Sequence, residues 1–133
     1  MTRAVTGAAT TLRLQAIVTS EAPRYISLTS LAQRKKVEVP VLTRWRHTGS
    51  TPVLGEDIRL GTDPGWDPER ADPWTPGCVP DAPPTPVLYW PAAEMLRRYH
   101  VSLDTLWTMI MLDRRLPMPA IWLDDRPGWE PEQ

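Results

Sequence analysis

A six-residue string occurs twice in this chain and constrains its fold more than any other feature. Residues 64–69 read Pro-Gly-Trp-Asp-Pro-Glu and residues 127–132 read Pro-Gly-Trp-Glu-Pro-Glu. Five of six positions are identical, and the remaining one exchanges one acid for another. A string of this length that includes tryptophan rarely recurs by chance. Its recurrence indicates a repeated structural unit, of which the string marks the end.

The region upstream of each copy supports this interpretation. A constant offset aligns several identical residues, and after one deletion the match continues downstream: Tyr25 with Tyr89, Arg34 with Arg98, Val37 with Val101, Leu42 with Leu106, and then Ile58 with Ile121 and Leu60 with Leu123. Other positions keep their apolar character, as expected when two copies of one fold retain their cores and diverge outside. The sequence therefore predicts an internal duplication, with Trp66 and Trp129 in equivalent and mostly buried places.

Each copy has the pattern of two helices followed by a hairpin. In the first, Ser27 is a suitable N-cap for a helix reaching about Lys36, and a second helix over 39–48 ends at Gly49. Apolar pairs separated by Gly, Asp and Pro then predict a β-hairpin, followed by a short helix from Asp67 to Trp74. The second copy predicts helices over 91–99 and 103–113 and a hairpin over 121–129, without the closing helix. We expect a mainly α fold with small β-hairpins, built as two tandem winged helix-turn-helix units.

These patterns divide the chain into four parts. An N-terminal arm covers residues 1–24, of which 1–11 are expected to be loose and 12–18 to form a strand. The first repeat covers 25–74, a proline-rich and extended linker covers 75–87, and a degenerate second repeat covers 88–133. The linker holds several of the chain's 16 prolines.

Composition limits the chemistry that the chain can perform. The single cysteine, Cys78, allows no intramolecular disulfide, and the two histidines lie far apart, so no metal site or cofactor is expected. No nucleophile–base pair or phosphate-binding glycine loop is present, which argues against an enzyme. The N-terminus lacks a continuous apolar run, so we expect a cytoplasmic protein without a membrane segment.

The first repeat resembles a known family of DNA-binding domains. The residues that carry the resemblance are Tyr25 to Ala32, Val37, Leu42 to Arg46, Ile58 to Gly61, Gly65, Trp66 and Trp74. They are similar to the small winged helix-turn-helix domains of the MerR/excisionase type, which are common in bacteriophages and mobile elements. The resemblance implies binding of double-stranded DNA by an excisionase or transcriptional regulator. It further implies that the second helix enters the major groove and that the wing contacts phosphate or the minor groove.

The basic residues of the first repeat fit this expectation. Residues 25–55 contain five basic side chains and one acid, although the net charge of the whole chain is −1. On a helix whose apolar stripe faces inward, the polar side chains face out, where they can reach bases and phosphates. An ordinary solvated basic face is the alternative interpretation. The predicted DNA-binding residues are Arg34, Lys35, Lys36, Thr43, Arg44, Arg46, His47 and Arg59.

The second repeat departs from the pattern in its second helix. At the positions of Thr43, Arg44, Arg46 and His47 stand Trp107, Thr108, Ile110 and Met111, so that this helix is apolar almost all round. Such a helix is buried rather than laid on phosphates. Trp107, Ile110 and Met111 are therefore predicted either to form a protein interface, giving a homodimer or higher self-association, or to complete a core.

Two functions of different classes follow. The first is a phage or mobile-element DNA-binding protein in which the first repeat reads duplex DNA and the second supports packing or self-association. The second is a protein-interaction module, a helix-turn-helix fold reused to bind a host or phage protein, which the acidic segments after each helical pair favour.

Overall fold

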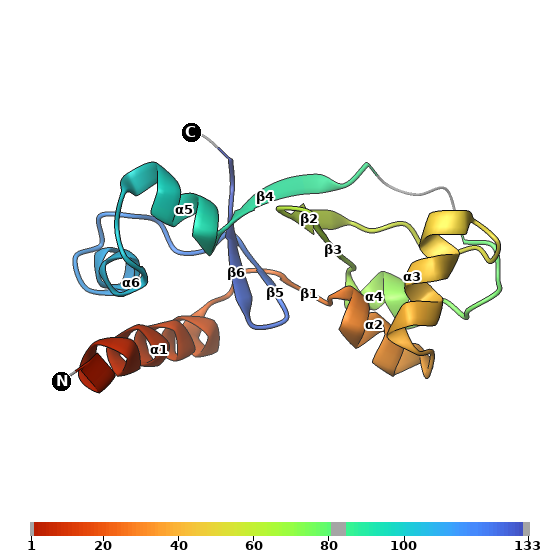
Figure 1. Ribbon diagram of the computed structural model, residues 1–133, viewed down its shortest axis with the longest axis horizontal. Coiled ribbons are helices and arrows are strands. Elements are labelled where there is room, and N and C mark those ends of the chain that lie inside the picture. The colour runs from red at the N-terminus through yellow and green to blue at the C-terminus, as the bar shows by residue number, and fades with distance from the viewer. Residues whose placement is uncertain (1, 81–84, 132–133) are drawn as a thin grey trace. The chain divides into compact units, whose positions relative to one another are not determined.

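The structure is a computed structural model that describes residues 2–80 and 85–131, with side chains described from Ala9 onward (Figure 1). Glu132, at the end of the second motif, and residues 81–84 of the predicted linker lie outside the described residues. The helices are α1 (Thr2–Thr19), α2 (Leu28–Lys35), α3 (Val39–Thr48), α4 (Pro68–Ala71), α5 (Ala92–Tyr99) and α6 (Leu103–Met111). The strands are β1 (Arg24–Tyr25), β2 (Ile58–Leu60), β3 (Asp63–Gly65), β4 (Val87–Pro91), β5 (Ile121–Leu123) and β6 (Arg126–Trp129).

The predicted fold class, mainly α with small β-hairpins, is wrong, because the chain has an α+β fold. Strand β4 makes the difference. Its first half pairs in parallel with β2, Ile58 opposite Val87, and its second half pairs antiparallel with β6, Trp90 opposite Trp129. Each predicted hairpin thereby becomes part of a larger sheet. A run of apolar residues that pairs on both sides gives no alternating pattern, and its partners lie far away in the sequence.

The chain divides into two compact units, and the division falls within β4. Residues 24–89 form one, which we call the central unit, and residues 1–23 together with 90–133 form the other, which we call the terminal unit. The described part of the predicted linker contains a turn in which the Cys78 N–H donates to the Thr75 carbonyl at 3.0 Å.

In the central unit α2 packs against α3 and contacts β3, and Ala71 of α4 joins the same core as the two helices. Its core contains Leu31 and Leu42, which are fully buried, together with Trp66 and Trp74. Leu42 lies on α3 in the predicted apolar stripe, and half-buried Trp45 packs against the same cluster. The apolar face of the two helices is thus directed inward, and their polar face is left to solvent.

The two copies repeat the same hydrogen bonds. In the central unit the Trp66 indole donates to the Leu54 carbonyl at 2.8 Å, and in the terminal unit the equivalent Trp129 indole donates to the Pro117 carbonyl at 3.0 Å. Ile26 bridges to Trp66 as its counterpart Trp90 pairs with Trp129. Trp66 is 0% exposed and Trp129 is 2% exposed. The prediction of equivalent, buried places for these tryptophans is confirmed.

The turn between the helices is also repeated. Lys36, after α2, and His100, after α5, adopt left-handed backbone conformations with φ values of 56° and 55°. Each residue ends its helix through a backbone N–H that returns to a carbonyl of the last turn. This conformation is uncommon outside glycine, so its recurrence at equivalent positions of the two copies agrees with a common origin of the two turns.

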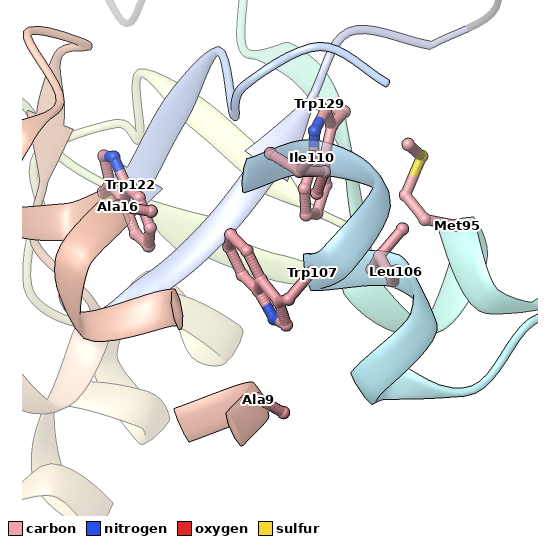
Figure 2. Close-up of a cluster of buried hydrophobic side chains, with 8 residues drawn as sticks. All are labelled: Ala9, Ala16, Met95, Leu106, Trp107, Ile110, Trp122 and Trp129. Carbon is pink, nitrogen blue, oxygen red and sulfur yellow. The ribbon is translucent and has the colours of Figure 1, made fainter. Parts of the chain in front are cut away.

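The N-terminal segment differs from the prediction. The expectation of a loose segment over 1–11 and a strand over 12–18 is wrong, because α1 is one helix from Thr2 to Thr19. Ala9 and Ala16 lie two turns apart on one face and are buried at 5% and 0% exposure in the core of the terminal unit (Figure 2). Two contacts fix the helix: the Ala9 N–H donates to Asp104 at 3.1 Å, and Arg13 donates to the Asp125 carbonyl at 2.8 Å. Small side chains spaced by seven allow α1 to cover the apolar helix α6, a tertiary effect that overrides local propensity.

Tryptophan side chains fill the centre of the terminal unit (Figure 2). The Trp107 ring stacks on Trp122 at a centroid distance of 6.4 Å and meets Trp129 at 6.2 Å in a tilted arrangement. Aromatic pairs at these distances add roughly 0.5–1.5 kcal/mol each beyond the area they bury. Trp129 of the second copy of the repeated motif therefore lies inside an aromatic core.

Within the residues that the structure describes, no helix has both the length and the hydropathy needed to cross a bilayer.

Candidate nucleic-acid interface

Local sequence signals fix the geometry of the helix pair α2–α3. The Ser27 hydroxyl accepts a hydrogen bond from the Ser30 N–H at 3.2 Å and caps α2. After the left-handed Lys36, the Val37 N–H returns to the Ala32 carbonyl at 2.9 Å, which closes the turn. Pro40 lies in the first turn of α3, and Gly49 (φ 70°) ends that helix. These caps and the turn set where α2 and α3 begin and end, and the packing of Leu31 and Leu42 in the core leaves the opposite faces outward.

The outward face of α3 carries cationic and polar side chains. Arg44 and His47 are exposed and lie one turn apart, and Thr43 is half-buried beside them. Lys36 lies in the turn that precedes α3. In the part of the chain that the structure describes, no hydrogen bond or ion pair engages these four side chains. They are available to an external anion.

Arg46 and Arg59 are instead held by one acid, Glu56. Its carboxylate accepts a hydrogen bond from Arg59 at 2.9 Å and from Arg46 at 3.4 Å, which links α3 to the hairpin. Burial raises the pKa of Glu56, but its backbone hydrogen bond, the hydrogen bond from Arg59 and the charge of Arg46 together lower that pKa below its ordinary value. The Arg46 guanidinium also lies 5.5 Å from the centre of the Trp66 ring. Two of the predicted DNA-binding cations are thus neutralised within the fold.

Arg34 and Lys35, at the end of α2, are engaged by the residue that follows α4. Arg34 pairs with the Asp72 carboxylate at 2.7 Å, and Lys35 donates to the Asp72 carbonyl at 2.9 Å. Arg34 retains 44% exposure, so the pair is solvated and weak. These contacts anchor α4 to α2.

The structure therefore divides the eight predicted DNA-binding residues into two groups. Lys36, Thr43, Arg44 and His47 lie on the turn and on α3 without partners among the described residues, whereas the remaining cations are paired with Glu56 or Asp72. The acids that make this division were missed by the sequence reasoning. Glu56 stands in a Gly-Glu-Asp string that is typical of a turn, and nothing local shows that two arginines converge on it.

Helix α6, which is the counterpart of α3 in the second repeat, has no cationic outward face of this kind. Trp107 and Ile110 are 1% and 3% exposed, and half-buried Met111 packs against the same core. Thr108 is half-buried as well. Helix α1 covers part of α6, so the apolar residues predicted for a protein interface lie in or against the core of their own unit. Arg97 and Arg98 of α5 both bind Glu94.

Removal of the Glu56 charge should release Arg46 and Arg59 from their ion pairs. For Glu56→Gln we expect tighter binding to duplex DNA at low salt and a steeper salt dependence. Freeing Arg46 and Arg59 adds up to two phosphate contacts, each worth roughly 0.9 in the slope of log K against log salt concentration. Fluorescence anisotropy over a salt series measures both quantities.

The matched control for that experiment is Glu69→Gln, which removes the same charge from an exposed position of the central unit. Equal slopes for the two variants would contradict a masking role for Glu56.

The same pair of variants tests how stability depends on pH. Because the folded-state pKa of Glu56 is lowered, its contribution to stability is present above the unfolded pKa and is lost as pH falls through the folded value. Glu56→Gln should therefore flatten the acid side of the stability profile.

Comparisons of this chain with protein-family models, with curated proteins and with solved structures find no match.

Proposed function

We propose that the protein binds double-stranded DNA through α3 of the central unit, as an excisionase or transcriptional regulator of phage or mobile-element type. The observation that carries the proposal is the face of α3. A capped helix that follows a tight turn presents Thr43, Arg44 and His47 outward, with Lys36 beside its N-terminal end. A helix of this kind fits the major groove of B-DNA.

The side chains on this face suit different parts of the nucleic acid. Arg44 can pair with a guanine edge in bidentate fashion or with phosphate, and Lys36 can pair with phosphate as a point charge. Thr43 can contact a thymine methyl group or a phosphate oxygen. In this proposal Arg44 recognises the base sequence of the DNA, and Lys36 holds the helix against the phosphate backbone of the DNA.

The hairpin of β2 and β3 supplies the second contact in this proposal. Arg59 lies on β2 with 49% of its side chain exposed, next to Glu56. A phosphate oxygen can replace the carboxylate as acceptor, because both are anionic oxygens of similar geometry. Approach of DNA would then cost the protein an internal ion pair, which limits non-specific affinity.

Protein binding is the second candidate function, and one observation favours it. Acids within the central unit already occupy Arg34, Arg46 and Arg59, so the exposed positive charge is small for a DNA-binding protein. In this alternative the same face of α3 contacts an acidic surface of a host or phage protein.

Self-association into a homodimer stays a prediction under either function. A DNA-binding role would place the protein in the cytoplasm.

Binding to a random-sequence duplex at low salt separates the two functions. A DNA-binding protein shows non-specific affinity there, which falls linearly on a logarithmic plot as salt rises. We expect saturable anisotropy changes at about 20 mM salt and their loss near 200 mM. Absence of binding at the lowest salt would favour the protein-interaction alternative, and sedimentation of the same sample reports the oligomeric state.

A further inference from the structure

The terminal unit contains an open groove of about 540 Å³. Trp90, Tyr99 and Trp129 line it with their aromatic rings, and Met95 adds a thioether. Figure 2 shows two of these side chains, Met95 on α5 and Trp129 on β6. All four belong to the terminal unit, so the groove is separate from the proposed DNA-binding face of α3. Its volume lies within the range of small-ligand sites, roughly 300–1,000 Å³.

The aromatic rings of the groove differ in exposure. Trp129 is 2% exposed and forms the base of the groove, whereas Tyr99 is 46% exposed and presents its ring to solvent. Half-buried Trp90 is held in place by the Arg98 guanidinium, which lies 3.8 Å from the centre of its ring. Arg98 in turn donates a hydrogen bond to the Glu94 carboxylate at 2.8 Å. A fixed apolar base together with an exposed ring suits a flat ligand that stacks on aromatic side chains.

Two side chains of opposite charge line the groove as well, and both are exposed: Arg115 and Glu130. They form no ion pair with each other, and among the described residues no hydrogen bond or ion pair engages the Arg115 side chain. A guanidinium matches the paired oxygens of a phosphate group. A carboxylate has several acceptor positions, so Glu130 can accept a hydrogen bond from a ligand N–H whatever else it contacts. The groove therefore favours a flat ligand that carries both a phosphate and N–H donors.

We propose that this groove binds a nucleotide, with guanine as the preferred base. The base stacks on Tyr99, Arg115 pairs with the phosphate, and Glu130 accepts hydrogen bonds from the base. Guanine presents its ring N–H and its amino group side by side, so both can donate to one carboxylate. Adenine offers one amino group on that edge, and thymine has no amino group and flanks its N–H with two carbonyl oxygens, which a carboxylate repels.

A free nucleotide and a nucleotide within a single strand present the same groups to the groove. A base inside a duplex does not, because it is paired and stacked. The proposal therefore does not depend on duplex binding by α3.

Calorimetric titration of the full chain with dGMP, dAMP and dTMP tests the choice of ligand. We expect saturable binding of dGMP with a Kd of about 0.1–1 mM, the range of a small ligand in an open site. Binding of dAMP should be weaker than that of dGMP, and binding of dTMP at least about tenfold weaker, because hydrogen bonds to a charged acceptor are lost. Inorganic phosphate is the control for the anion alone.

Three outcomes of this titration would overturn the proposal. The first is equal affinity for dTMP and dGMP, the second is equal affinity for phosphate and dGMP, and the third is no saturation by about 10 mM dGMP.

Two pairs of protein variants localise the site. Tyr99→Ala removes the exposed ring, and its control Leu112→Ala shortens a 65% exposed side chain outside the groove. Arg115→Ala removes the partner of the phosphate, and its control Arg114→Ala removes a neighbouring exposed cation that does not line the groove. Binding of dGMP should weaken at least about fivefold in Tyr99→Ala and in Arg115→Ala and stay unchanged in both controls. Equal losses within either pair would overturn the assignment to this groove.

A fluorescein-labelled thymidine hexamer with one guanine distinguishes the two sources of the nucleotide. Affinity at least about tenfold above that of dGMP, reduced by Tyr99→Ala, assigns the groove to single-stranded nucleic acid. Affinity no higher than that of dGMP assigns it to a free nucleotide. Arg44→Ala, in the central unit, should leave dGMP binding unchanged, so failure of the groove and failure of the α3 face are separate results.

Discussion

Replacement of Trp66 by alanine should lower the free energy of unfolding by about 3–5 kcal/mol, the cost of emptying a fully buried aromatic site. Trp66 is 0% exposed, and its indole donates to the Leu54 carbonyl at 2.8 Å. Truncation removes the core contacts and also leaves that carbonyl without its donor. Urea denaturation followed by circular dichroism measures the change, provided that the denaturant slope stays constant.

Two further substitutions divide this cost into its parts. Trp66→Phe keeps most of the ring but loses the hydrogen bond, so it should cost about 1–3 kcal/mol. Leu88→Ala, at a residue 55% exposed on β4, serves as the control and should stay within about 0.5 kcal/mol. A stability of Trp66→Ala as high as that of Leu88→Ala would show that the repeated motif does not anchor the core.

Arg44→Ala should weaken binding to a specific duplex by about 1–3 kcal/mol if the guanidinium pairs with a base edge. If it pairs with phosphate, binding should weaken evenly across sequences and the salt slope should fall by about one. Lys36→Ala should show only the second behaviour, because an ammonium in the turn before α3 is placed for the backbone. Anisotropy with several duplex sequences over a salt series distinguishes these outcomes.

The control for the two substitutions is Arg114→Ala. Arg114 is an exposed cation of the terminal unit, and its removal changes the net charge by the same amount. Equal losses for Arg44→Ala and Arg114→Ala would mean that binding depends on total charge and not on the face of α3. A loss confined to Arg114→Ala would reverse the roles assigned to the two repeats.

The helices of both repeats could be predicted because their signals are local. Ser27 and Ser102 cap α2 and α6 through their hydroxyls, Gly49 ends α3, and the apolar spacing around Leu42 marks its buried face. The repeated Pro-Gly-Trp string located the hairpins and the two buried tryptophans. Signals of this kind act within a few residues of the chain, so they are readable without knowledge of tertiary contacts.

The strand pairing and α1 could not be predicted for the opposite reason. The pairing of β4 with β2 joins Ile58 to Val87, and the packing of α1 joins Ala9 to Asp104. Residues that pair over such long sequence distances are brought together by the tertiary fold, so the sequence near each of them carries no pattern that predicts the pairing. The alternating stretch around Leu12 is compatible with a strand when only local pattern is considered. In the folded chain it is helical, because α1 packs over the apolar helix α6.

The prediction of the DNA-binding residues from sequence was limited in the same way, because it lacked tertiary contacts. Sequence reasoning can place Arg44 and Arg46 on one helix, but it cannot show that Glu56 engages Arg46 across the unit while Arg44 remains open to solvent. Side chains close together in sequence thus differ in availability because of one acid from a neighbouring loop. On α3 and the turn before it, the predicted residues without partners in the described part of the chain are Lys36, Thr43, Arg44 and His47.

Hydrogen exchange of the full chain with and without duplex DNA tests most directly whether α3 is the DNA-binding element. At low salt, saturating duplex should slow exchange in residues 36–47, which cover the turn and most of α3, and leave residues 103–111 of α6 unchanged. Slower exchange confined to α6, or no change in either helix under conditions where anisotropy reports binding, would contradict the assignment of α3 as the helix that contacts DNA.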